Sequence, residues 1–448
     1  MSQVDESTQQ REEELEAPAG AADPIGNSVG DYLNNYVKRL RGGEMGSLPA
    51  MSGLIVLVAL FWILHPPFGT LNNFGNMLTE GAGPIFIAIG LVFVLLLGEI
   101  DLSAGFAAGV CAMVMVRLMV GYNAPWPVSI GAALVTGVII GLLIGLLRAK
   151  VRIPSFVVTL AFFLAFQGVA LFIANNGKGQ TGNITITDGF VNALDGSQMP
   201  VWGGWLMAAI VILGYAGVKL SAQVGRRKQG LPMEPFAVIA FKIGALTLGT
   251  VLVVWALSIN RAVNKTPVLT AVNGKFVKVT PPALQGVPWV VPLLLVVFVV
   301  FTFVLSRTRY GRHVYAVGGN EEASRRAGIP VDRIRISVFV ICSFAAAIGG
   351  ILIGSNVQSV SVANYGGNTL LLAVGAAVIG GTSLFGGKGR VIDAVIGGLV
   401  VEVIYNGMSD LVQGTNSSAV QYVVTGLVLM AAAAIDALSR RRAGANGL

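Results

Sequence analysis

The chain of 448 residues is 54% hydrophobic and only 12% charged, which is about half the charged fraction of a soluble domain. Its mean hydropathy is +0.75. These values exclude a soluble globular protein and indicate a helical protein that crosses a membrane many times.

The formal net charge of +8 does not point to nucleic acid, because of where the basic residues lie. They collect in short polar loops between apolar runs, at 148–152, 226–228, 307–335 and 440–442. This distribution is the positive-inside pattern of membrane proteins, and no cluster combines aromatic and basic residues as base-stacking sites do. We therefore expect the lipid bilayer, and no nucleic acid, among the partners.

Residues 1–46 are polar and contain an acidic run at 12–16, followed by Ala, Gly and Pro. A segment of such low hydrophobicity is predicted to be a disordered tail. It lacks the basic start and early apolar core of a cleaved signal peptide, so we place it in the cytoplasm. Residues 47–440 are expected to form one transmembrane domain.

Each crossing of a bilayer needs about 20 apolar residues, and the sequence has twelve candidate runs. They lie near 49–64, 82–98, 103–120, 127–147, 155–175, 203–221, 237–258, 288–306, 337–356, 369–383, 391–406 and 420–438. The run at 369–383 is short and almost no loop follows 82–98, so broken or re-entrant segments are expected. The predicted fold class is an all-α polytopic bundle of about 10–12 transmembrane helices. With both termini in the cytoplasm, the basic segments all fall on the cytoplasmic face.

The loop 259–287 falls on the opposite, extracytoplasmic face. Its residues 268–279 alternate between apolar and polar side chains around Asn273-Gly274, which is a strong hairpin signal. We expect a small β-hairpin here, packed on a neighbouring loop because two strands alone are only marginally stable.

Several glycines within the apolar runs recur at four-residue spacing. The pairs are 105 and 109, 141 and 145, and 350 and 354. Small residues at this spacing are typical of membrane helices that pack closely, so the sequence predicts a tight bundle.

A polar segment, GEIDLSAG at 98–105, separates two apolar runs. A carboxylate at the bilayer centre costs about 2.5–3.5 kcal/mol on insertion scales, so two acids here imply water, partners or a function. We interpret Glu99, Asp101 and Ser103 as candidates for a translocation pathway. The alternative is an ordinary interfacial turn in which Asp101 or Ser103 caps the next helix.

A second polar interruption is IGGTSLFGGKGR at 379–390. Its Gly-Gly-Lys does not make a phosphate loop, because Thr382 stands where the Walker pattern needs glycine and Gly389 where it needs Ser or Thr. Irregular backbone at membrane depth is tolerated where it is buried in protein or lines a cavity, and paired interruptions in two halves point to a pathway. We therefore predict a broken helix on the pathway, with Gly380, Gly381, Thr382, Ser383 and Gly386 as its residues.

The polar loop 307–336 carries the pattern of a short helix at about 321–327. An asparagine precedes it as a good N-cap, and two glutamates in its first turn and two arginines in its last suit the helix dipole. A glycine that can adopt the left-handed conformation and then a proline end it. This helix is either a plain surface helix or a rigid element that docks a partner. Its defining residues are Asn320, Glu321, Glu322, Arg325, Arg326 and Gly328.

Three motifs resemble the permease subunits of bacterial ABC importers for sugars of the ribose, galactose and xylose type. GEIDLSAG is similar to their G-G-I-D-L-S-V-G motif, and VIGGTSLFGGKG is similar to V-I-G-G-T-S-x-x-G-G-x-G. RTRYGRHVYAVGGNEEASRRAGI resembles their cytoplasmic coupling loop, which carries the signature E-A-A-x-x-x-G. The resemblance covers about residues 80–435, and the extra span and basic loop near 219–258 are most similar to the xylose-type branch. Glu99 departs from the family, which usually has Gly there.

The resemblance implies a membrane-spanning transport subunit without catalytic residues, metal ligands or a cofactor of its own, because a separate chain hydrolyses ATP. The implied partners are a cytoplasmic ABC ATPase that receives the helix at 321–327 in a cleft, an extracytoplasmic sugar-binding protein and a second permease protomer, expected to be a copy of this chain. The implied cargo is a monosaccharide, with a pentose such as xylose favoured. The implied location is the bacterial plasma (inner) membrane.

Two other classes of function stay open at this point. An ion-coupled secondary transporter needs acids embedded in the membrane, for which Glu80, Glu402 and Asp410 are candidates near the ends of spans. A membrane-embedded enzyme needs reactive groups within the spans, and the apolar runs contain no acid/base pair, Ser-His pair or set of metal ligands.

Overall fold

A computed structural model provides the structure of the protein. It describes residues 46–176, 182–231, 233–262, 268–272, 275–279, 283–412 and 419–427, with isolated helical residues at 30, 34, 430, 431 and 434. Nearly all of the predicted tail 1–46 therefore lies outside the described residues, as does part of the last predicted span, 420–438.

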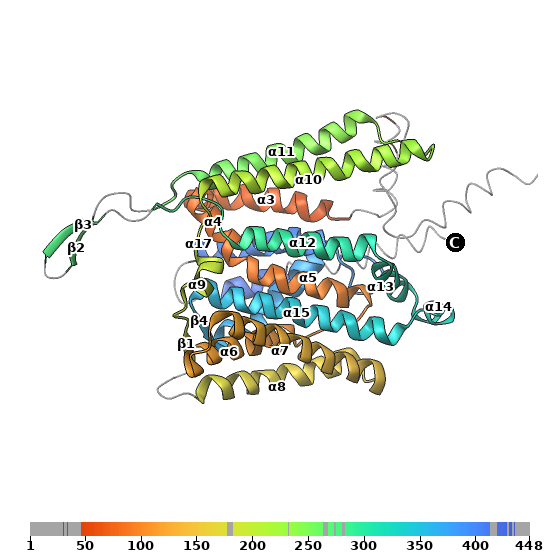
Figure 1. The fold of residues 1–448 in the computed structure, drawn as a ribbon, viewed down its shortest axis with the longest axis horizontal. Coiled ribbons are helices and arrows are strands. Elements are labelled where there is room, and N and C mark those ends of the chain that lie inside the picture. Colours follow the sequence, from red (N-terminus) through yellow and green to blue (C-terminus); the bar gives the residue numbers. More distant parts are fainter. Residues whose placement is uncertain are drawn as a thin grey trace, which may run out of the picture.

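The fold is a bundle of helices that run back and forth between two ends (Figure 1). The long helices are α3 (Leu48–Leu64), α5 (Ala82–Leu96), α6 (Ala104–Tyr122), α7 (Trp126–Leu146), α8 (Ser155–Asn175), α10 (Val201–Lys228), α11 (Phe236–Ser258), α12 (Val290–Arg307), α15 (Val331–Val357), α16 (Gly367–Ile379) and α17 (Val391–Leu411). Shorter helices join them: α4 (Leu71–Glu80), α9 (Gly189–Gly196), α13 (Arg309–Gly319) and α14 (Glu321–Arg326). Single turns are η1 (Pro66–Gly69), η2 (Leu147–Val151) and η3 (Val362–Asn364).

Nine helices among the described residues are long and apolar enough to cross a membrane. The number rises to ten if α4 and α5, which meet at a bend of 43°, count as one span. This confirms the polytopic all-α class and agrees with the lower end of the predicted 10–12 crossings. Helix α3 is apolar but shorter than the rest, with 17 residues.

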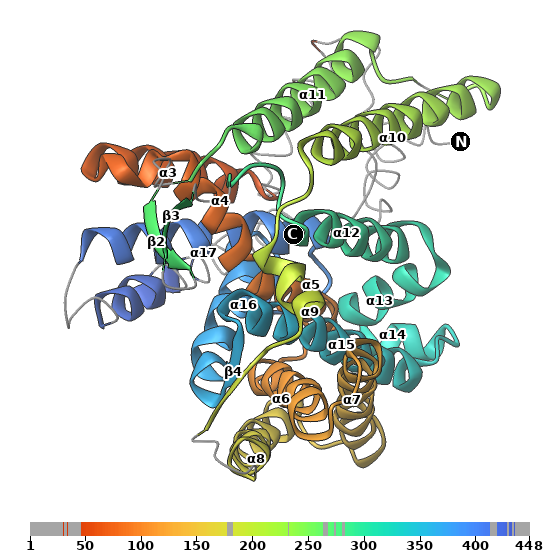
Figure 2. The same ribbon diagram turned by 60° about the vertical axis from the view of Figure 1, so that its left-hand side comes forward.

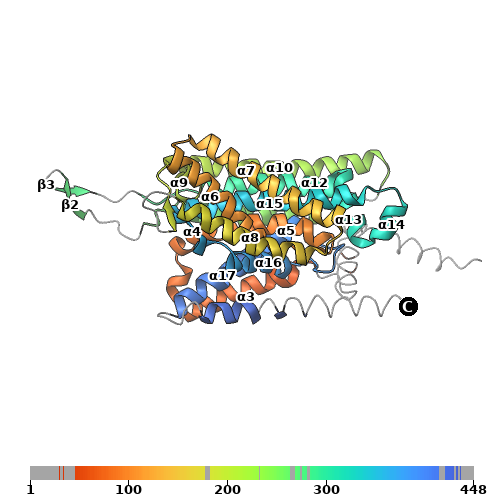
Figure 3. The ribbon, with the colours of Figure 1, turned by 90° about the horizontal axis from the view of Figure 1, so that it is seen from below.

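The predicted hairpin is present, but among the described residues it stands apart from the bundle (Figure 1), so the expected packing on a neighbouring loop is not seen. Strands β2 (Val268–Val272) and β3 (Lys275–Val279) pair antiparallel, with Val268 opposite Val279 and Val272 opposite Lys275. A second small sheet, which the sequence did not predict, pairs β1 (Asn183–Thr185) with β4 (Ser359–Ser361). The hairpin projects from one end of the bundle and α14 from the other (Figure 3), so we name these the hairpin end and the α14 end.

Helix α5 lies at the centre of the bundle. Every residue of α5 except Pro84 is buried, because α15, α16, α17, α6 and α12 all pack against it. An apolar helix without a polar face is suited to this position. The loops at its two ends are consequently held within the body of the protein.

Glycines let α15 approach α6 and α7 closely. A Cβ atom on Gly141 of α7 would meet the Phe339 carbonyl of α15, and one on Gly350 of α15 would meet the Ala108 carbonyl of α6. The four-residue glycine spacing in the sequence therefore marks real helix contacts, where small residues bring backbones together.

The α10–α11 pair stands to one side of the other helices (Figure 2). Its apolar cluster, formed by Ala208, Val254, Leu257 and Val287, lies near the hairpin end. Large apolar side chains along the rest of the pair, such as Leu213 and Leu248, are exposed. Such faces are suited to contact with lipid.

Candidate functional site

The short helix α14 is built as its sequence predicts. The Asn320 side chain accepts a hydrogen bond from the Ala323 amide at 2.9 Å, which satisfies a free amide of the first turn. Gly328 follows with a φ of +81°, in the left-handed conformation that ends many helices. The helix spans Glu321–Arg326, one residue shorter than predicted.

The chain before α14 is more ordered than the predicted polar loop. Residues Arg309–Gly319 form α13, whose N-cap Thr308 accepts a hydrogen bond from the Gly311 amide at 3.1 Å. Helix α13 is amphipathic and buries Val314 and Val317. It therefore holds α14 against the bundle as part of a folded unit.

Glu321 and Glu322 are neighbours on α14 with different surroundings. Each forms an ion pair with the arginine four residues later, Glu321 with Arg325 at 3.1 Å and Glu322 with Arg326 at 3.0 Å. Only Glu321 also reaches Arg335 of α15, at 2.8 Å. Partial burial raises the pKa of the Glu321 carboxyl, but the hydrogen bonds and charges of Arg335 and Arg325 outweigh this and lower it.

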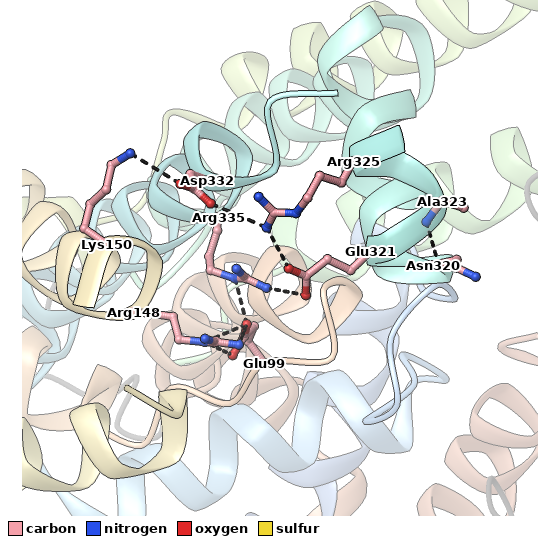
Figure 4. Close-up of polar contacts among 9 residues, drawn as sticks. All are labelled: Glu99, Arg148, Lys150, Asn320, Glu321, Ala323, Arg325, Asp332 and Arg335. Carbon is pink, nitrogen blue, oxygen red and sulfur yellow. Dashed lines mark hydrogen bonds and ion pairs between the residues drawn. The ribbon is translucent and has the colours of Figure 1, made fainter. Parts of the chain in front are cut away.

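Arg335 connects α14 to the segment at 98–105 (Figure 4). It is 5% exposed, and its Nε lies 2.9 Å from Oε1 of Glu99. Arg148, near the end of α7, holds the same carboxylate, with its Nη2 2.8 Å and its Nε 2.9 Å from Glu99. We name this set of four side chains, Glu321, Arg335, Glu99 and Arg148, the ion-pair chain.

A second group of contacts lies beside the ion-pair chain. Lys150 pairs with Asp332 at 3.3 Å, and Arg325 lies 3.7 Å from the same carboxylate. These three side chains are substantially exposed, so their pairs contribute little stability. They show that α14, the first turn of α15 and the end of α7 meet at the α14 end.

The two polar interruptions that the sequence singled out lie side by side. The Gly387 amide donates to the Leu96 carbonyl at the end of α5, at 2.8 Å, and a Cβ atom on Gly386 would lie 2.9 Å from the Gly98 nitrogen. Helix α13 packs on both, because the Tyr315 hydroxyl donates to the Gly389 carbonyl at 2.7 Å. The segments 98–103 and 380–390, which are almost 300 positions apart in the sequence, therefore form one layer against α13.

The structure places most of the predicted pathway residues inside this layer. Asp101, Ser103, Thr382 and Ser383 are buried, as are Glu99, Gly380 and Gly386, whereas Gly381 is exposed. Asp101 accepts hydrogen bonds from the Ser103 amide at 2.9 Å and the Ser103 hydroxyl at 2.6 Å. Both contacts lie within the loop, and Ser103, the N-cap of α6, makes no side-chain capping hydrogen bond.

Nothing in the sequence indicates that Arg148 and Arg335 share a partner. Both belong to the basic segments that mark the cytoplasmic face. The signal that would have found them is Glu99 itself, because a buried carboxylate needs compensating positive charge. Sequence spacing alone does not show that α7 and α15 meet there.

The candidate acids for an ion-coupled transporter lie toward the hairpin end of the bundle, away from the ion-pair chain. Glu402 of α17 is buried and Glu80 of α4 is exposed; the Asp410 side chain lies outside the described part. Asp195 of α9, which the sequence did not single out, is 2% exposed. Burial, with a smaller effect of the Glu80 charge, raises the pKa of Asp195 to about 8. Within the described residues no group of three His, Cys, Asp or Glu side chains is placed to hold a metal ion.

Comparison with known proteins shows what kind of molecule carries this arrangement. Residues 73–197 and 196–433 match the family described as the branched-chain amino acid transport system / permease component. The chain belongs to this permease family. It is therefore a multi-pass transport subunit of the inner membrane and not an enzyme.

Individual relatives give the same result. The chain is 32% identical to the xylose transport system permease protein XylH of Escherichia coli K12, over 88% of this chain and 92% of the relative. It is 30% identical to XylH of Haemophilus influenzae, over 83% and 90%, and 28% identical to the ribose import permease protein RbsC of E. coli K12, over 86% and 92%. These relatives confirm the resemblance that the motifs indicated. No solved structure matches the chain.

Proposed function

We propose that this permease is the membrane-spanning subunit of an ABC importer for a monosaccharide, with a pentose such as xylose as the cargo. Its relatives named for xylose and ribose transport cover nearly the whole chain. An ATPase on the cytoplasmic side drives the transport, an external sugar-binding protein delivers the cargo, and a second copy of this chain completes the pathway.

The observation that carries the proposal is α14. It is capped, its ends carry charges that suit the helix dipole, and it projects beyond the bundle (Figure 1). The Arg326 side chain is 79% exposed and that of Glu322 is 72% exposed. A rigid, charged helix at the end of a membrane bundle is suited to dock in a cleft of a water-soluble subunit.

We assign the pathway to the layer formed by 98–103 and 380–390. Glu99, Asp101, Ser103, Gly380, Gly381, Thr382, Ser383 and Gly386 are its residues. All of them except Gly381 are buried, which corresponds to a closed state, and passage of a sugar requires the two segments to separate. A switch between two such packings is a rigid-body transition of the kind that closure of a docked subunit produces.

The test is sugar uptake by the reconstituted complex. The permease is co-purified with the ABC ATPase and sugar-binding protein encoded beside it, and uptake of labelled pentoses and hexoses into liposomes is measured with and without ATP. We expect ATP-dependent uptake with xylose as the best substrate. Uptake of hexoses alone would contradict the pentose assignment, and uptake driven by an ion gradient without ATP would overturn the importer assignment in favour of a secondary transporter.

A further inference from the structure

The geometry of the ion-pair chain points to Glu99 and Arg335 as positioning residues that link the motion of α14 to the closed layer. We propose that the chain Glu321–Arg335–Glu99 passes movement of α14 to the segment 98–103. This inference rests on the proposed function, because it requires α14 to be the element on which a driving subunit acts.

Arg335 is the residue that connects Glu321 to Glu99. It is nearly inaccessible to water, and its guanidinium lies between two carboxylates, with Glu99 at 2.9 Å and Glu321 at 2.8 Å. The Nη2 of Arg335 donates a hydrogen bond to Glu321, whereas its Nε faces Glu99 as an ion pair without hydrogen-bond geometry. A displacement of Glu321 therefore breaks the pair with Arg335 or moves Arg335 relative to Glu99.

Glu99 is fixed on its other side by the loop in which it lies. The Glu99 amide donates to the Val94 carbonyl at 3.2 Å. The next residue, Ile100, donates its amide to the Ser155 hydroxyl at 3.3 Å and accepts from the Thr159 hydroxyl at 3.2 Å. Movement of Glu99 consequently involves the end of α5 and the start of α8.

The Glu99 carboxylate compensates the positive charge of two arginine side chains. Arg148 and Arg335 both reach the same carboxylate, so removing it would leave two partly or wholly buried guanidinium groups close together. Breaking a buried pair from one side leaves an uncompensated charge and is strongly unfavourable.

The adjacent glutamates of α14 provide a matched test. Glu321→Gln and Glu322→Gln change the same helix by the same chemistry, and each removes one pair with an arginine four residues away. Only Glu321→Gln also removes the negative charge that pairs with Arg335. The sugar transported per ATP hydrolysed is measured in liposomes for both variants, for Glu99→Gln and for the double variant Glu99→Gln/Glu321→Gln, with co-purification of the ATPase and melting temperature as further readouts.

We expect Glu322→Gln to keep the wild-type ratio of sugar to ATP. Because Glu322 lies on the exposed face of the docking helix, any effect of this variant should appear as weaker co-purification of the ATPase. Glu321→Gln should lower the sugar transported per ATP several-fold while the ATPase still co-purifies. Because both residues act in one chain, the double variant should lose no more than the more impaired single variant. If Glu99→Gln fails to fold, Glu321→Gln carries the test alone, because this side chain is 45% exposed.

The failure of this inference differs from failure of the proposed function. If the wild-type complex transports sugar and Glu321→Gln behaves like Glu322→Gln, the link is overturned while the importer assignment stands. Fully additive losses in the double variant would also overturn it. If the wild-type complex shows no ATP-dependent uptake at all, the proposed function fails and the link fails with it.

Discussion

Asp101 is buried, and its carboxylate faces Ser103 of its own loop and the Cys342 thiol of α15. The carboxylate accepts from the amide and hydroxyl of Ser103, immediately before α6 begins at Ala104. Burial raises the pKa of this carboxyl, and the hydrogen bonds from Ser103 offset the rise only in part. What the fold uses here is an acceptor oxygen more than a negative charge.

Replacing Asp101 with Asn or Leu separates these two properties. Asp101→Asn keeps an acceptor oxygen and should melt close to the wild type. Asp101→Leu leaves the buried amide and hydroxyl of Ser103 without an acceptor, at a cost of about 1–3 kcal/mol, although leucine itself inserts readily into a membrane. We expect a lower melting temperature and lower sugar uptake for Asp101→Leu. A leucine variant as stable as the asparagine variant would contradict this role.

At the scale of the element, α15 is the helix on which others pack most closely. Its residue Gly350 faces the Ala108 carbonyl of α6, and the Gly350 carbonyl accepts from the Tyr365 hydroxyl at 2.8 Å. By contrast, a Cβ atom on Gly214 of α10 would meet nothing within 4 Å. These two helical glycines differ in their surroundings and not in their helical backbone.

Alanine at the two positions should therefore have opposite effects. In a helix interior alanine is favoured over glycine by about 1 kcal/mol, so Gly214→Ala should leave the melting temperature unchanged or raise it. Gly350→Ala should lower it, because overpacking costs about 1–3 kcal/mol. Melting of the two purified proteins in the same detergent measures the difference. Equal or reversed shifts would show that α15 and α6 do not pack in this way.

The same elements show what the sequence predicts well. Long apolar runs predict most span boundaries within about four residues, because every crossing must bury or face lipid along its whole length. The exceptions are the end of α10, the start of α15 and the end of α17, where the helices extend beyond the apolar runs by seven, six and five residues. The capping residues predict the position of α14, because capping depends on residues that are close together in the sequence. Helix α13 was missed because its apolar residues are few, and the β1–β4 pair was missed because its partners are far apart in the sequence. The ion-pair chain was missed for the same reason, since it joins α7, α15 and the segment at 98–103.

At the scale of the whole molecule, the two ends differ in chemistry. The α14 end holds η2, which follows α7, and the basic ends of α10 and α12, with Arg148, Arg226 and Arg307 among their residues. The hairpin end holds β2 and β3 and the small β1–β4 sheet. An excess of Lys and Arg in short loops marks the cytoplasmic side of a membrane protein, so we expect α14 to face the cytoplasm and the hairpin to face outward.

Labelling of single introduced cysteines tests this orientation. The native Cys111 and Cys342 are both buried, so they should contribute little background with a bulky, membrane-impermeant maleimide. Arg326→Cys places a thiol on α14, and Thr187→Cys places one at an exposed position beside β1. In intact cells we expect labelling of the cysteine at 187 only, and labelling of both after the membrane is opened. The reverse pattern would place α14 outside, where no ATP-driven subunit could reach it, and would contradict the orientation and the coupling role together.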